Sequence, residues 1–157
     1  MALTVFRAGE AISAGDAVYV DSSSFLRRAV ATTFAEASVV GLAIDAASAG
    51  QPVRVNTDGI YTGLSALTPG DFVFLSYLSP GQLVSFADWE TAISTVAFNP
   101  FLARVGRAIT PTSLEIETSR PVAFVNPTSI LLLESSTGTQ LDALLLEDGS
   151  FIDLEAA

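Results

Sequence analysis

Residues 12–20 read ISAGDAVYV and residues 67–75 read LTPGDFVFL, so the pair Gly-Asp occupies the same place in two segments 55 positions apart. Further along, VGLAI at residues 40–44 returns as VGRAI at residues 105–109, now 65 positions later. The second copy therefore holds an insertion of about ten residues. Each copy is too small to bury an apolar face of its own, so the repeat predicts two halves of one antiparallel β-barrel or sandwich.

Within each copy the residue types are those of short strands separated by turns. Gly15-Asp16 and Gly70-Asp71 each open a run of branched and aromatic residues, which favour a half-buried strand. Residues 39–44 are nearly all apolar, which predicts a strand buried on both faces. Asp58-Gly59 predicts a two-residue hairpin turn. We therefore expect an all-β fold.

Composition predicts a body followed by an arm. The body, residues 1–125, holds pseudo-repeats at about 12–61 and 67–117. The arm, residues 126–157, has six acidic residues and no basic residue, and the letters LLLE occur in it twice, 13 residues apart. A disordered acidic tail would not carry this much leucine. The arm is therefore predicted to form short β-units that pack on one another or on another protein.

The composition removes most catalytic chemistry. The chain of 157 residues has no Cys and no His, and all seven basic residues are Arg. Without a thiolate, an imidazole or a lysine amine, we expect no enzyme activity, no metal site and no cofactor. The formal charge of −10 disfavours nucleic acid and anionic membranes as partners. No secretory signal and no apolar run of about 20 residues are visible in the sequence.

Two acidic patterns have a chemical and a structural interpretation. Glu115 and Glu117 stand two apart on a predicted strand and so face one side, as a glycosidase carboxylate pair would. No opposing acid is evident, and a solvated strand face is the favoured interpretation. Asp148-Gly149-Ser150 resembles part of a calcium loop but lacks the ligand spacing, so a hairpin turn is expected there.

The insertion in the second copy is the first candidate for an interface. It spans residues 87–101 and contains the only Trp of the chain. Its aromatic residues either cap one end of the barrel or project as a binding surface, because aromatic side chains seldom stay exposed without a partner. The candidate interface residues of the insertion and of the leucine-rich arm are Trp89, Phe98, Phe101, Leu131, Leu132, Leu133, Leu144, Leu145 and Leu146.

The order of the sequence motifs in the first copy resembles that of a known family. Gly15-Asp16 with the strand that follows, then VGLAI at 40–44, then AGQPVRV at 49–55 and Asp58-Gly59, is similar to the small β-rich capsid decoration (cement) proteins of tailed bacteriophages. The resemblance covers residues 8–61 and extends over 67–117 through the repeat. The LLLE units resemble terminal segments of other phage virion proteins.

The resemblance implies a virion structural protein without catalytic activity. Such a protein is made in the host cytoplasm, sits on the capsid exterior, often as a homotrimer, and bridges subunits of the major capsid protein. Two alternatives stay open from the sequence. One is a phage tail or fibre-knob subunit. The other is a carbohydrate-binding module, whose platform would need exposed aromatic side chains such as Trp89 and Tyr77.

Overall fold

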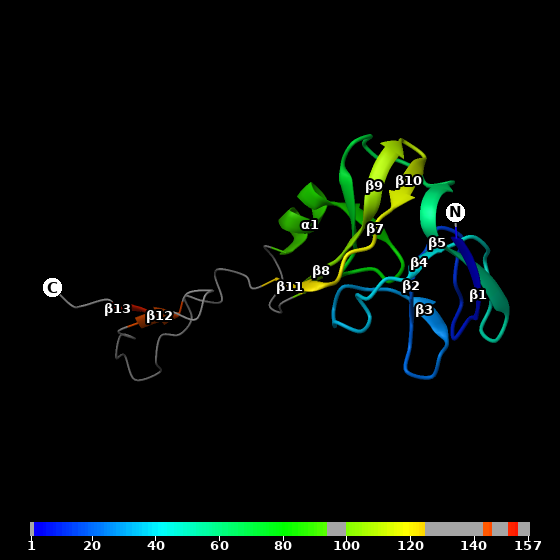
Figure 1. The fold of residues 1–157 in the computed structure, drawn as a ribbon, viewed down its shortest axis with the longest axis horizontal. Helices are drawn as coiled ribbons and strands as arrows, with labels where there is room; N and C mark the ends of the chain where they lie inside the picture. Colours follow the sequence, from blue (N-terminus) through cyan, green and yellow to red (C-terminus); the bar gives the residue numbers. More distant parts are fainter. Residues whose placement is uncertain (1, 94–99, 125–142, 146–150, 154–157) are drawn as a thin grey trace. The chain divides into compact units, whose positions relative to one another are not determined.

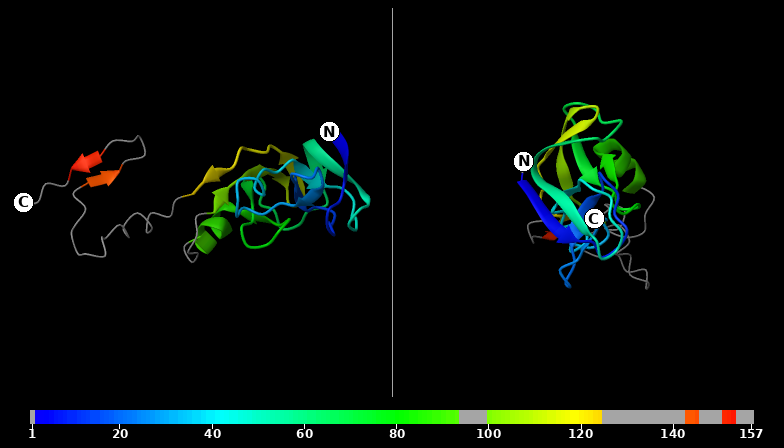
Figure 2. Two further views of the ribbon diagram at one scale, coloured as in Figure 1. Left: turned by 90° about the horizontal axis from the view of Figure 1, so that it is seen from below. Right: turned by 90° about the vertical axis from the view of Figure 1, so that its right-hand side faces the viewer.

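The computed structural model describes residues 2–93, 100–124, 143–145 and 151–153. The chain divides into two compact units, residues 1–124 and residues 125–157. The first unit is the body, and it is built around one curled antiparallel sheet of nine strands (Figures 1 and 2). The predicted all-β fold is therefore confirmed.

The strands of the body fall into two series along the chain. The first series is β1 (Ala2–Arg7), β2 (Ala17–Val20), β3 (Leu26–Arg28), β4 (Gly41–Ala43) and β5 (Pro52–Thr62). The second series is β6 (Phe72–Leu75), β7 (Leu83–Ser85), β9 (Arg104–Thr110) and β10 (Ser113–Ile116). Helix α1 (Phe86–Ile93) follows β7, and a small separate sheet pairs β8 (Phe101–Leu102) with β11 (Val122–Ala123).

The two series share one pairing order. The sheet runs β3-β2-β4-β5-β10-β9-β6-β7. Strand β1 also pairs with β5, outside this order. Read outward from the β5–β10 pair, β4 corresponds to β9, β2 to β6 and β3 to β7. The register corresponds as well, because Val18 lies opposite Gly41 and Val73 lies opposite Gly106.

The two Gly-Asp turns make equivalent backbone hydrogen bonds. The Gly15 N–H donates to the Ala43 carbonyl at 2.8 Å, and the Gly70 N–H donates to the Ala108 carbonyl at 2.8 Å. Both glycines have a positive φ, +90° at Gly15 and +94° at Gly70, which explains why glycine stands at each turn. The repeated sequence thus corresponds to a repeated backbone arrangement.

Strand β5 joins the two halves, and here the hairpin prediction is wrong. Asp58-Gly59 lies inside one continuous strand of 11 residues, whose first part pairs with β1 and β4 and whose last part pairs with β10. The register against β1 skips Thr57, which marks a bulge directly before Asp58, and Gly59 has a φ of +85°. A hairpin would return β5 on itself. The bulge redirects the strand into the second half.

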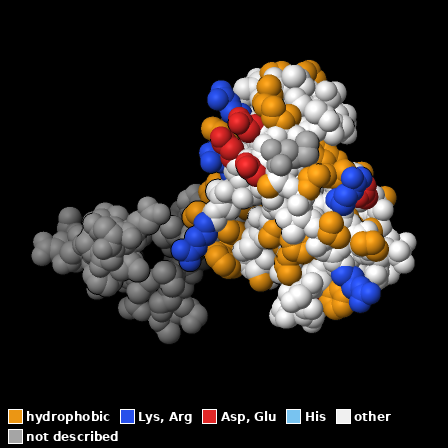
Figure 3. All heavy atoms as spheres, turned by 45° about the vertical axis from the view of Figure 1, so that its right-hand side comes forward, with side chains coloured by type: hydrophobic (Ala, Val, Ile, Leu, Met, Phe, Trp, Pro, Cys, Tyr) orange, Lys and Arg blue, Asp and Glu red, His pale blue; other side chains and the backbone are white. Residues whose placement is uncertain are grey.

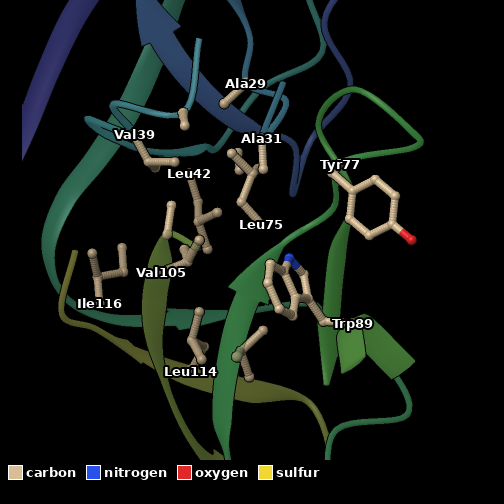
Figure 4. Packing of buried hydrophobic residues seen from close by; sticks show 14 of the residues in the cluster. Ala29, Ala31, Val39, Leu42, Leu75, Tyr77, Trp89, Val105, Leu114 and Ile116 are labelled. Carbon is tan, nitrogen blue, oxygen red and sulfur yellow. The ribbon is translucent and has the colours of Figure 1, made fainter. Parts of the chain in front are cut away.

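The two ends of the curled sheet meet through irregular backbone. The Gly81 N–H donates to the Ala29 carbonyl at 2.7 Å, and the Ala31 N–H donates to the Ser76 carbonyl at 3.0 Å. Between the halves lies the main core, to which β4 contributes Leu42 and β9 contributes Val105 (Figure 4). A second core covers the other face of β2 and β4. Gly41, Leu42 and Ala43 are all buried, which confirms the prediction for residues 39–44 at these positions.

Helix α1 occupies the start of the insertion. Ser85 caps it, because the Asp88 N–H donates to Ser85 Oγ at 3.1 Å while Ser85 Oγ donates to the Asp88 carboxylate at 2.8 Å. Trp89 and Ile93, four residues apart, turn inward from the helix. The Ser-x-x-Asp pattern before this apolar pair is a helix signal that the strand-based interpretation of the sequence missed.

The second unit contains one described hairpin. Strand β12 (Ala143–Leu145) pairs antiparallel with β13 (Phe151–Asp153), with Leu144 opposite Ile152. The predicted turn at residues 148–150 and the leucine triplet at residues 131–133 lie outside the described residues.

Candidate interaction surfaces

The aromatic residue of greatest interest, Trp89, lies in the core. Its side chain is 1% exposed and is surrounded by aromatic rings from three parts of the body. The ring centroids lie 5.0 Å from Phe124, 6.2 Å from Tyr77 and 6.3 Å from Phe86. Figure 4 shows the indole beside Leu75, facing the interior of the sheet. Trp89 therefore joins α1, the segment after β6 and the end of the body into one packed group.

The assignment of Trp89 to an interface with another chain is therefore wrong. The insertion needs a large apolar side chain to hold α1 against β6 and β7, and Trp89 supplies it. Tyr77 is only 4% exposed, so neither Trp89 nor Tyr77 offers the open aromatic face that a carbohydrate-binding platform needs. Of the two interpretations of the insertion, the cap on the barrel is correct for Trp89.

Phe101 lies at the surface boundary and forms what we call the β8–β11 patch with its neighbours. Phe101 is half-buried, and its ring meets the exposed ring of Phe34 edge-on at 6.1 Å. The Arg120 guanidinium lies 5.5 Å from the Phe34 ring, and Val122 on β11 is 63% exposed. This patch combines apolar area, aromatic rings and one arginine, which is the composition common at protein interfaces. Phe98 and Leu146 lie outside the described residues.

A second exposed apolar surface lies on strand β1. Val5 is 64% exposed and Leu3 is half exposed, and both belong to the outer face of the sheet. Within the described residues β1 pairs only with β5, so its other edge is open. Open apolar edges favour pairing with another chain. This strand is not among the interface residues predicted from the sequence. The signal is the apolar-rich run LTVF at residues 3–6, in which Leu3 and Val5 fall on one face of a strand.

Charged side chains lie at the surface of the body (Figure 3), and four arginines form ion pairs with carboxylates among the described residues. Arg27 Nε lies 2.6 Å from Asp21, and Arg54 Nε lies 2.7 Å from Asp45. The hydrogen bond from Arg27 lowers the pKa of the Asp21 carboxyl, and the hydrogen bond from Arg54 lowers that of Asp45. These pairs order loops, and exposed pairs of this kind contribute little to stability.

In the part of the chain that the structure describes, no group of three or more Asp and Glu side chains is placed to bind a metal ion. Glu115 and Glu117 are exposed, and Glu117 lies 3.8 Å from Arg104 Nη2, so this pair belongs to a solvated face of the sheet. Residues 148–150, the site of the calcium-loop alternative, lie outside the described part.

No known protein family matches this chain, and no curated protein is significantly similar to it. None of the helices in the described residues has the length and apolar character needed to cross a membrane.

Proposed function

We propose that this protein is a virion structural subunit, a capsid decoration (cement) protein that binds the outside of a phage head. In this proposal it stabilises contacts between major capsid protein subunits and acts as a homotrimer. The observation that carries the proposal is that the family-like residues have defined backbone roles. Gly15 forms the turn, and Gly41 lies so close to the Asn56 carbonyl that any side chain would collide with it. Gly70 and Gly106 repeat both roles in the second half.

The distribution of apolar surface supports a bridging role. A cement protein must contact at least two neighbours, and the body has two separate apolar surfaces. The β8–β11 patch and strand β1 lie toward opposite ends of the body in Figures 1 and 2. Exposed apolar patches on both favour two partners rather than one.

The copy number in purified particles tests the proposal. Quantitative mass spectrometry of virions that carry this protein should find it in hundreds of copies, in fixed proportion to the major capsid protein. A handful of copies per particle would instead favour the tail or fibre-knob alternative. Absence from the particle would contradict both.

Two paired variants test which surface attaches. Phe34→Asp with Val122→Asp places charge on the β8–β11 patch, and Leu3→Asp with Val5→Asp places it on β1. Because these side chains are exposed, each pair should leave thermal unfolding nearly unchanged while weakening attachment to capsids at least tenfold. Attachment that neither pair weakens would exclude both surfaces.

The role of the arm requires a separate test. A chain truncated after Val125 keeps Phe124, whose ring contacts Trp89, and so should fold as the intact body does. If the arm binds neighbouring subunits through Leu131–Leu133 and Leu144–Leu146, the truncated chain should attach less tightly or assemble less well with its own copies. Equal attachment by both chains would show that the arm is passive.

A further inference from the structure

Asp16 is the one charged residue that is buried among the residues that the structure describes, with 6% of its surface exposed. Its Oδ2 accepts a hydrogen bond from the Ser13 N–H at 2.8 Å. None of the ion pairs formed by the described residues includes Asp16. A buried carboxylate is normally paired with a cation, because leaving its charge uncompensated away from water is costly.

A pocket of about 220 Å³ opens beside this carboxylate. It is bounded by the Gly15-Asp16 turn, by the crossover segment at residues 63–67 and by the turn at residues 81–83. The volume is several times the roughly 30 Å³ that one water molecule occupies in the liquid. Leucine side chains supply its apolar walls, namely Leu64, Leu67 and Leu83.

The backbone of Gly81 lies directly against the acid. A Cβ added at Gly81 would lie 2.8 Å from Asp16 Cγ, and the φ of +80° is itself a glycine conformation. The Tyr61 hydroxyl lies near the same turn, 3.7 Å from the position of a Cβ on Gly15. Burial raises the pKa of Tyr61, and the negative charge of Asp16 raises it further. The charge of Asp16 therefore acts on Tyr61, whose hydroxyl lies beside the Gly15-Asp16 turn.

The equivalent turn of the second half, Gly70-Asp71, shows that this backbone arrangement does not require a buried acid. Asp71 makes the same backbone bonds as Asp16, since the Ala108 N–H donates to its carbonyl at 2.9 Å as the Ala43 N–H does to that of Asp16. Asp71 nevertheless is exposed, and nothing lies within 4 Å of a Cβ added at Gly70. Of the two equivalent turns, only the first therefore has a buried carboxylate, and the pocket lies beside it.

We propose that this pocket binds an alkylammonium or alkylguanidinium group. The cationic end lies against the Asp16 carboxylate, and the carbon stem packs on Leu64, Leu67 and Leu83. This inference does not depend on the proposed function. The cation is supplied either by a lysine or arginine side chain of another protein or by a free polyamine. A second copy of this chain would offer arginine alone, because the sequence contains no lysine.

The test is a nuclear magnetic resonance titration of the full ¹⁵N-labelled chain with n-butylammonium chloride at constant ionic strength. The backbone amides of Gly15, Leu64 and Gly81 should shift and saturate with a dissociation constant on the order of 1–10 mM. The neutral isostere n-butanol should bind at least tenfold more weakly. Shifts that do not saturate, or equal shifts with n-butanol, would overturn the proposal.

Matched variants locate the charge. Asp16→Asn keeps an oxygen that can accept from the Ser13 N–H but removes the charge, so it should weaken n-butylammonium binding at least tenfold. Asp71→Asn at the equivalent turn should bind as the natural chain does. Equal binding by Asp16→Asn would contradict the proposal. Should Asp16→Asn fail to fold, the comparison with n-butanol on the natural chain decides alone.

The two sources of the cation are separated by comparing ligands on the natural chain. Nα-acetyl-lysine methylamide and Nα-acetyl-arginine methylamide represent protein side chains, and putrescine represents a free polyamine. Tighter binding of the amino-acid derivatives supports a protein side chain, and tighter binding of putrescine supports a polyamine. Failure of all three to bind would overturn the proposal.

Discussion

At the scale of single residues, the closest backbone approaches occur at Gly41 and Gly106. A Cβ on Gly41 would collide with the Asn56 carbonyl, and a Cβ on Gly106 would collide with the Glu115 carbonyl. Neither carbonyl can retreat easily, because both belong to neighbouring strands of the sheet. The matched collisions explain why the two VG pairs recur 65 positions apart.

Alanine at either of these glycines should therefore destabilise the body. We expect Gly41→Ala and Gly106→Ala each to lower the free energy of unfolding by about 1–3 kcal/mol, measured by urea denaturation. Gly50→Ala is the control, because its φ of +85° carries a backbone cost but no atom lies within 4 Å of the added Cβ. Gly41→Ala no more costly than Gly50→Ala would show that the strands adjust freely.

Trp89 gives a second prediction at this scale. Truncating a buried aromatic side chain leaves a cavity, so Trp89→Ala should lower the free energy of unfolding by about 3–5 kcal/mol. Phe86→Ala, on the same helix and nearly half exposed, should cost clearly less. Thermal and urea unfolding measure both. If the melting temperature of Trp89→Ala were close to that of the natural chain, Trp89 would not be part of the core.

At the scale of elements, β5 decides how the halves are joined. Asn56 is 1% exposed, and its side chain spans the bulge. Its Nδ2 donates to the Ile60 carbonyl at 3.2 Å, and its Oδ1 accepts from the Asp58 N–H at 3.4 Å. These bonds join the Asn56 side chain to the backbone on the far side of the bulge.

Asn56→Ala should therefore weaken the junction between the two halves. The Ile60 carbonyl would lose a partner, which costs about 1–3 kcal/mol when the group is left unsatisfied. Thr57→Ala is the neighbouring control, because its hydroxyl bonds the Ala2 carbonyl at an exposed position and its loss should cost less than about 0.5 kcal/mol. Chemical denaturation of the two variants provides the comparison, and equal losses would contradict this role for Asn56.

At the scale of the whole molecule, the tyrosines link pH to folding. Burial raises the pKa of Tyr19, of Tyr61 and of Tyr77 above the ordinary value of 10.0. The unfolded chain releases these protons near pH 10 while the folded chain retains them. Stability is therefore full below about pH 10 and is lost as the pH rises through the folded values.

Alkaline titration tests this linkage. Tyrosinate absorbance should rise together with the loss of near-ultraviolet circular dichroism, because ionisation and unfolding are coupled. Tyr61→Phe should make the decline in stability with pH less steep, since one fewer proton is released on unfolding. Complete ionisation near pH 10 with the native spectrum retained would mean that the tyrosines are open to solvent.

The sequence by itself determined the all-β class and the repeated turns, because both depend on local patterns. Gly15 and Gly70 indicate a left-handed backbone conformation, and the apolar run at residues 39–44 indicates a strand buried on both faces. These signals lie within a few residues and need no knowledge of distant parts of the chain.

Only the tertiary structure decided the backbone conformation at Asp58-Gly59 and the burial of Trp89 and Asp16. The same Asp-Gly pair suits a hairpin or a bulge, and the choice depends on β10 pairing with the end of β5. Trp89 is buried because Tyr77 and Phe124 come together around it. Asp16 differs from Asp71 because segments distant in the chain cover one turn and leave its sister exposed. Each outcome depends on long-range contacts, which local residue patterns do not specify.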